Sequence, residues 1–199
     1  MKKAICVLLL LLLAGCRNLS TNVPTAPAAT VSMSPTADPT GEGDAHAAEY
    51  AFSFTAQTLD GAEMTEAAFS EHDLTMVNVW ASWCPPCRGE LPELAALYGR
   101  LPENVGFLSV TVDDPGDLPD AKTLLGQNGC AFPCLDGQGS EGLMKNLLGR
   151  VMAIPTTVFF DSQGNEVGDW IVGVPQGKGS VSDAYLAEIQ ARLDLLKGK

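Results

Sequence analysis

The chain has 199 residues, of which 24 are acidic and 12 basic, so its formal net charge at pH 7 is −12. Nucleic-acid binding requires clustered basic residues that neutralise phosphates, so this balance argues against a nucleic-acid partner. The length suits one domain with a hydrophobic core, and no internal repeat is visible.

The N-terminus predicts export from the cytoplasm. Two lysines precede an unbroken apolar run from Val7 to Leu13. A helix that crosses a bilayer needs ~20 apolar residues, so the shorter run predicts a secretory signal over residues 1–15. The segment from Leu13 to Cys16 resembles the lipobox of bacterial lipoproteins, whose cysteine is lipidated after cleavage just before it. This resemblance implies an anchor at Cys16 on the extracytoplasmic face of a bacterial membrane. The alternative is ordinary secretion with a chance cysteine.

Residues 16–48 predict a disordered tether behind the lipidated cysteine. Thr, Pro, Ala, Ser and Gly dominate this stretch, and it has no apolar periodicity. Such a composition cannot bury enough surface to offset the entropy of ordering the chain. His46 lies in the stretch and is most simply a solvated residue.

We expect residues 49–199 to form one folded domain. Its first part predicts a hairpin over 51–65 with a turn at Asp60-Gly61, a buried strand over 74–80, a helix after Cys84, a strand over 105–112 and a helix over 117–127. The second part predicts a helix over 141–148, strands over 156–160 and 166–172, and a last helix that begins at Ser180 with a capping box to Asp183. The buried stripe of that helix is expected to contain Tyr185, Leu186, Ile189, Leu193 and Leu196.

The order of these elements indicates the fold class. Strands and helices alternate first, and two neighbouring strands follow near the end of the chain. This order predicts an α/β fold in which helices flank a mixed central sheet, with an N-terminal β-hairpin.

The sequence Cys84-Pro85-Pro86-Cys87 stands between a predicted strand and a predicted helix. Unpaired N–H groups and the positive dipole end at a helix N-terminus favour a thiolate over a thiol. The thiolate is the nucleophile in thiol–disulfide exchange, so Cys84 is predicted to attack and Cys87 to resolve the mixed disulfide. The two prolines have no N–H to leave unsatisfied, and they remove a donor that could stabilise the thiolate.

The segment from Trp80 to Pro92 resembles the active-site segment of the TlpA/ResA-like thioredoxin family. Ile154-Pro155-Thr156 resembles the cis-proline segment of that family, and the runs 132–136 and 159–164 also resemble the family pattern. The resemblance implies a thioredoxin-like fold and a membrane-tethered, extracytoplasmic thiol–disulfide oxidoreductase, usually a reductant.

The family resemblance also implies partners for the protein. They are an oxidised client, either an apocytochrome c or a methionine sulfoxide reductase, and a transmembrane electron donor of thiol type. We expect a monomer without a cofactor or a bound metal. A disulfide-introducing oxidase, or a binding or chaperone protein without turnover, is the alternative.

Further site residues follow from the same resemblance. Glu90 takes the position of the family's active-site glutamate, and its spacing puts it on the helix face of Cys87, where a buried carboxylate can accept a proton. Cytoplasmic thioredoxins keep a buried Asp at the position of Asn78. The residues expected to bind the substrate are Trp83, Pro85, Pro86, Ile154 and a cis-Pro155, whereas Trp80 is expected in the core.

Two metal-binding alternatives fit the sequence poorly. A structural zinc site needs four ligands, and the next two cysteines lie much farther along the chain than the ~15–20 residues of ribbon-type sites. A copper chaperone of the thioredoxin-like type needs a histidine after the cysteine pair, but His46 and His72 both precede it.

Cys130 and Cys134 depart from the family pattern. In an extended chain their Cα atoms would lie about 13 Å apart, beyond the ~7 Å limit for a disulfide, so a bridge requires a local turn. A structural or regulatory disulfide, a second redox pair and two separate thiols all remain open.

Overall fold

The structure is a computed structural model, and it describes residues 51–198. The predicted signal segment, the lipidated Cys16 and the tether up to residue 48 lie outside the described residues. Within the described part of the chain, no helix combines the length and the apolar character needed to cross a membrane.

A five-stranded sheet forms the centre of the domain, in the order β5-β4-β3-β6-β7. Strand β3 (Leu74–Trp80) pairs in parallel with β4 (Val105–Thr111) and antiparallel with β6 (Thr156–Asp161). The short strands β5 (Cys134–Asp136) and β7 (Ile171–Val172) extend the two edges, parallel to β4 and antiparallel to β6. This arrangement confirms the predicted mixed sheet.

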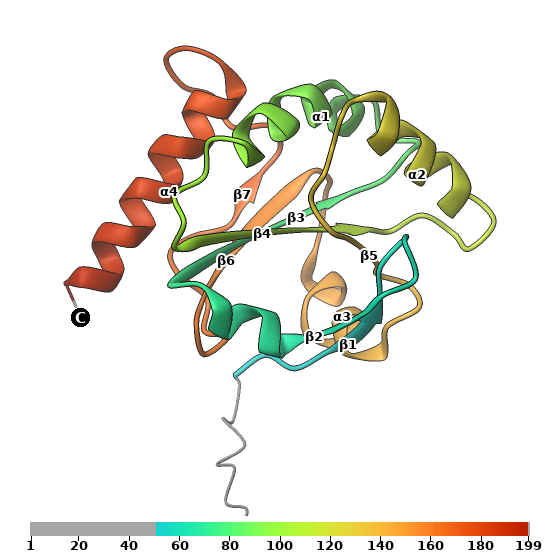
Figure 1. Ribbon diagram of the computed structural model, residues 1–199, viewed down its shortest axis with the longest axis horizontal. Helices are drawn as coiled ribbons and strands as arrows, with labels where there is room; N and C mark the ends of the chain where they lie inside the picture. Colours follow the sequence, from blue (N-terminus) through green and yellow to red (C-terminus); the bar gives the residue numbers. More distant parts are fainter. Residues whose placement is uncertain (1–50, 199) are drawn as a thin grey trace, which may run out of the picture. The chain divides into compact units, whose positions relative to one another are not determined.

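Helices cover both faces of the sheet (Figure 1). Helices α1 (Pro85–Tyr98), α2 (Leu118–Gln127) and α4 (Val181–Lys197) lie on one side. The other side holds α3 (Glu141–Asn146), the hairpin of β1 (Thr55–Gln57) and β2 (Glu63–Thr65), and a 3-10 helix, η1 (Glu66–Glu71). A second 3-10 helix, η2 (Leu148–Arg150), follows α3.

Strand β3 faces a separate hydrophobic core on each side of the sheet. Side chains alternate between the two faces of a strand, so Leu74, Met76 and Trp80 enter the core beneath α1 and α4. Val77 and Val79 enter the opposite core, which also contains Phe52 and Phe54 from the segment just before β1. By the same alternation, Asn78 faces α1, and it is the one polar side chain that β3 places on that face.

Most predicted elements are present within a few residues of their expected bounds. The hairpin turns at Gly61, whose φ of 87° is in the left-handed region. The capping box of α4 is also confirmed, because Ser180 Oγ accepts the N–H of Asp183 while an oxygen of the Asp183 carboxylate accepts the N–H of Ser180.

The strand expected over 166–172 is largely wrong. Only Ile171–Val172 forms a strand, and Glu166 makes a single bridge to Phe160. Gly168 lies between them with a φ of 73°, which turns the chain out of the extended conformation. Strand β5 was not predicted.

Candidate active site

The disulfide Cys84–Cys87 begins helix α1, directly after the loop that follows β3. The two Cα atoms are 5.3 Å apart. Cys84 is the N-cap of α1, and its Sγ accepts the backbone N–H of Cys87 at 3.3 Å. Pro85 and Pro86 occupy the first helical positions. Cys87 is fully buried and Cys84 is 4% exposed, so any partner can approach only from the side of Cys84.

The residues expected to bind a substrate surround Cys84. Trp83 is 61% exposed, as expected, and Trp80 is buried in the core. The Ile154–Pro155 peptide bond is cis, and the Ile154 carbonyl oxygen lies 3.7 Å from Cys84 Sγ. Of the two carbonyls on either side of Pro155, that of Ile154 faces the sulfur, whereas that of Pro155 accepts the N–H of Gly173 at 2.8 Å.

An open groove of about 430 Å³ lies beside Trp83. Its walls come from Ser82, Trp83 and Arg88 near the disulfide and from residues of the α2 region, including Asp117 and Asp120. Trp83 therefore borders this groove and is also the residue next to Cys84 in the chain.

Glu90 is buried behind the disulfide, with 1% of its surface exposed. The apolar stripe of α1 contains Leu91, Leu94 and Leu97, and this spacing turns Glu90 and Cys87 inward together. Burial raises the pKa of Glu90 from 4.5 to about 7, while hydrogen bonds from Asn78 and Tyr185 lower it. A carboxylate that titrates near neutral pH is suited to proton transfer.

Asp113 is a buried residue of the site that the sequence analysis missed. Its carboxylate accepts the Ser82 N–H at 2.9 and 3.1 Å, the Ser82 hydroxyl at 2.6 Å and the Thr111 hydroxyl. These bonds hold the loop two residues before Cys84. Its position directly after the predicted strand 105–112 is the only sequence signal that could have found it.

Cys130 and Cys134 are free thiols in the structure, rather than a disulfide. Cys130 is half-buried, and its Sγ lies 3.6 Å from the carbonyl oxygen of Leu91. Cys134 is buried at the start of β5. Burial raises the pKa of both thiols to about 11, so very little thiolate forms at neutral pH. Within residues 51–198, no three side chains of His, Cys, Asp or Glu form a cluster that could hold a metal ion.

The fold and the site together define a class of protein. A mixed sheet, a disulfide at the N-terminus of the helix that follows its central strand, and an adjacent cis-proline are the features of the thioredoxin-fold thiol–disulfide oxidoreductases.

Comparison with known proteins agrees with this class. The DsbE homolog of Paracoccus denitrificans, a thiol:disulfide interchange protein, is 34% identical over 110 residues, which are 54% of this chain and 56% of that protein. The thiol-disulfide oxidoreductase ResA of Halalkalibacterium halodurans is 29% identical over 124 residues, or 62% of this chain and 67% of that protein. The similarity therefore spans between about half and two thirds of these relatives.

A solved structure and a family match extend the comparison. The thiol:disulfide interchange protein of Chlorobium tepidum TLS aligns with a TM-score of 0.58 and 25% identity, over 72% of this chain and 95% of that one. Residues 47–165, more than half of the chain, match the AhpC/TSA family. The chain belongs to the AhpC/TSA family, and its similarity to ResA agrees with the expected resemblance to the TlpA/ResA-like thioredoxin proteins.

Proposed function

We propose that the protein is a membrane-tethered, extracytoplasmic oxidoreductase that reduces the disulfides of partner proteins. The Cys84 thiolate attacks a client disulfide and forms a mixed disulfide, while the first client sulfur leaves as a thiolate. Glu90 takes the proton of Cys87, whose sulfur then attacks Cys84 and releases the second client sulfur. The client gains two electrons and the protein keeps the Cys84–Cys87 disulfide, which a transmembrane donor of thiol type reduces again.

The number of hydrogen-bond donors to Cys84 supports the reducing direction. Within the described residues, one backbone N–H, that of Cys87, donates to Cys84 Sγ. Pro85 and Pro86 have no N–H that could add to it. A strong disulfide donor owes its potential to a stabilised reduced form, and the two prolines limit the stabilisation of the Cys84 thiolate to the helix N-terminus and one N–H.

The cellular setting of the proposal follows from the sequence. The lipobox-like segment ending at Cys16 and the tether to residue 48 favour an anchored protein with a mobile catalytic domain. An apocytochrome c or a methionine sulfoxide reductase is the client that the TlpA/ResA-like family suggests. The remaining alternatives are a disulfide-introducing oxidase and a binding protein without turnover.

The reduction potential of the Cys84–Cys87 pair tests the direction of electron flow. It is measured in glutathione buffers on protein in which Cys130 and Cys134 are both replaced by serine. We expect a value near or below about −230 mV, in the range of thioredoxin and glutaredoxins. A value near about −120 mV would identify a disulfide donor and would overturn the reductant proposal.

A trapping experiment separates turnover from simple binding and identifies the client. In Cys87→Ala the first exchange step is intact and the second is blocked, so mixed disulfides through Cys84 should accumulate. Mass spectrometry of the trapped proteins then names the client. A binding protein would keep its affinity in this variant without accumulating covalent partners.

A further inference from the structure

Four buried polar side chains behind the cysteine pair form a closed ring of hydrogen bonds. Asn78 Nδ2 donates to Glu90 Oε1 and to Thr157 Oγ1, both at 3.1 Å. Thr157 Oγ1 and the Tyr185 hydroxyl are 3.1 Å apart, and that hydroxyl donates to Glu90 Oε2 at 3.2 Å. The ring joins α1, β3, β6 and α4, and all four residues are buried.

The direction of each hydrogen bond follows from the chemistry of the groups. An amide nitrogen can only donate, so Asn78 gives one hydrogen to Glu90 and the other to Thr157. Thr157 then has its own hydrogen available for Tyr185, and Tyr185 has its hydrogen available for Glu90. The ring therefore has two arms, the direct bond from Asn78 and the path through Thr157 and Tyr185. Each arm ends as a donor to one oxygen of the ionised Glu90 carboxylate.

The two arms respond differently when Glu90 takes up a proton. A protonated carboxyl needs an acceptor for its new O–H, and Asn78 Nδ2 cannot be one. A tyrosine hydroxyl can donate or accept, so Tyr185 can rotate to accept from Glu90 and donate to Thr157 instead. Burial, followed by the nearby Glu90 carboxylate, raises the pKa of Tyr185, so its hydroxyl keeps its hydrogen throughout.

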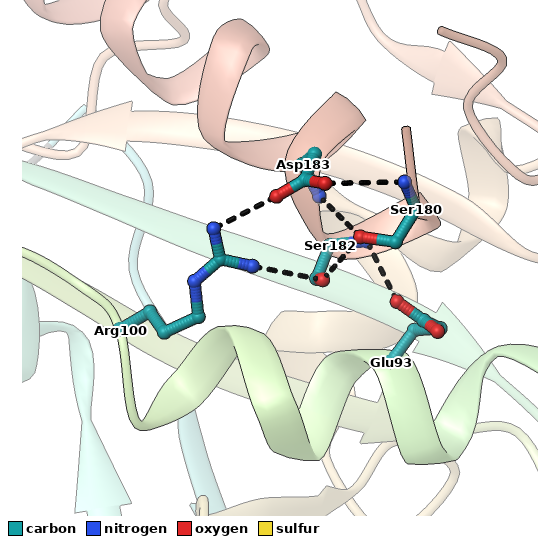
Figure 2. A network of polar contacts seen from close by, with 5 residues as sticks. All are labelled: Glu93, Arg100, Ser180, Ser182 and Asp183. Carbon is teal, nitrogen blue, oxygen red and sulfur yellow. Dashed lines mark hydrogen bonds and ion pairs between the residues drawn. The ribbon is translucent and has the colours of Figure 1, made fainter. Parts of the chain in front are cut away.

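A second polar network fixes Tyr185 relative to α1. Glu93 on α1 accepts the backbone N–H of Ser182 at 3.1 Å. Arg100, just after α1, donates to Ser182 Oγ at 3.1 Å and to Asp183 Oδ1 at 2.8 Å (Figure 2). These contacts join the first turn of α4 to α1, the helix that carries Glu90, and Tyr185 follows two residues after Asp183. The Tyr185 hydroxyl on α4 therefore reaches the Glu90 carboxyl on α1 at a place where this network already joins the two helices.

We propose that Tyr185, supported by Thr157, is a positioning residue that holds the Glu90 carboxyl in both its ionised and protonated forms while Cys87 is deprotonated. The proposal rests on the proposed function of Glu90 as the proton acceptor. Of the titratable groups around Glu90, Tyr185 contacts it directly, and Cys87 and Glu93 lie one turn away on α1. Strands β3 and β6 contribute only the neutral Asn78 and Thr157.

The test is a titration of Glu90 in the reduced protein, followed by carboxyl ¹³C NMR and assigned with Glu90→Gln. Tyr185→Phe removes the bond to both forms of the carboxyl, but the bond to the ionised form is charge-assisted and the stronger of the two, so the titration midpoint should rise by about one pH unit. The release of a client from the mixed disulfide should slow by about fivefold to tenfold at pH 7 and recover near pH 9. A purely structural role would not give this recovery.

Matched variants guard against a folding defect. Thr157→Val removes the support of Tyr185 and should raise the Glu90 midpoint less, whereas Thr157→Ser keeps the hydroxyl and should restore it. Tyr98→Phe changes the partly exposed tyrosine that ends α1, away from the hydrogen-bonded ring, and should leave the midpoint unchanged. An unchanged midpoint in folded Tyr185→Phe would overturn the inference. If the midpoint moves while Glu90→Gln releases the client at the normal rate, the positioning role stands and the proton-acceptor function falls.

Discussion

Two pairs of cysteines lie in this domain, and they differ in their place on the backbone. Cys84 and Cys87 bracket the first turn of α1, where the helix brings them into bonding distance and a backbone N–H meets the first sulfur. Cys130 stands in the irregular segment between α2 and β5, and Cys134 begins β5; burial raises the pKa of both thiols. The reactivity of a cysteine therefore follows from its position on the backbone. A second cysteine nearby does not by itself make a thiol reactive.

The largest expected effect is on client reduction. Cys84→Ser removes the nucleophile, so turnover should fall by about a thousandfold or more. The double variant Cys130→Ser/Cys134→Ser should keep nearly full turnover, measured with a disulfide-bonded client and a thiol reductant. A comparable loss of turnover in the double variant would place Cys130 and Cys134 in the electron path, and would contradict the difference between the two pairs.

Alkylation of the reduced protein compares the thiols directly. With a pKa of about 11, only about one in a thousand of the Cys130 and Cys134 side chains is ionised at pH 8. We expect iodoacetamide to modify Cys84 at least about a hundredfold faster, as followed by peptide mass spectrometry. In denaturant the rates should converge, which is the control for peptide recovery.

Glu90 gives the Cys84–Cys87 region a pH dependence that the second pair lacks. Its pKa of about 7 in the folded protein exceeds the ordinary value of 4.5, so the folded state binds the proton more tightly than the unfolded chain. Its contribution to stability is therefore full below pH 4.5 and is lost as the pH rises through 7, in total about 3 kcal/mol. Urea unfolding of the oxidised protein should show this decline, relative to Glu90→Gln. Parallel pH curves for the two proteins would contradict the assignment.

The smallest effect concerns packing around the second pair. Cys134→Ser places a hydroxyl in the core beneath α1 and should lower the free energy of unfolding by about 1–2 kcal/mol. Cys130→Ser, at a half-buried position, should change it by less than about 1 kcal/mol. Additive effects in the double variant are expected from separate thiols, whereas strong coupling would indicate a bond between them.

The sequence predicted the features that depend on local spacing. The apolar run of β3, the Cys-Pro-Pro-Cys turn and the Ser180–Asp183 capping box each depend on residues a few positions apart. The cis form of Pro155 followed only from the family resemblance. Strand β5 was missed because three residues after a proline give no periodicity, and only pairing with β4 makes them a strand.

The supporting residues of the site could not be found in this way. Tyr185 looked like one more member of an apolar helix stripe, and Thr157 like an ordinary strand residue. Their hydroxyls acquire a role only because α4 and β6 bring them to Glu90 from far along the chain. Asp113 likewise meets Ser82 through the parallel pairing of β3 with β4.

The burial of the disulfide has a consequence for selectivity among redox reactions. Cys87 is fully enclosed, and Cys84 shows only an edge between Trp83 and the Ile154 carbonyl. A partner must therefore bring its sulfur close to Cys84 alone, which an extended chain can do more easily than a convex folded surface. If the protein acts as the proposed reductant, the same burial slows the loss of its electrons to partners that cannot reach Cys84.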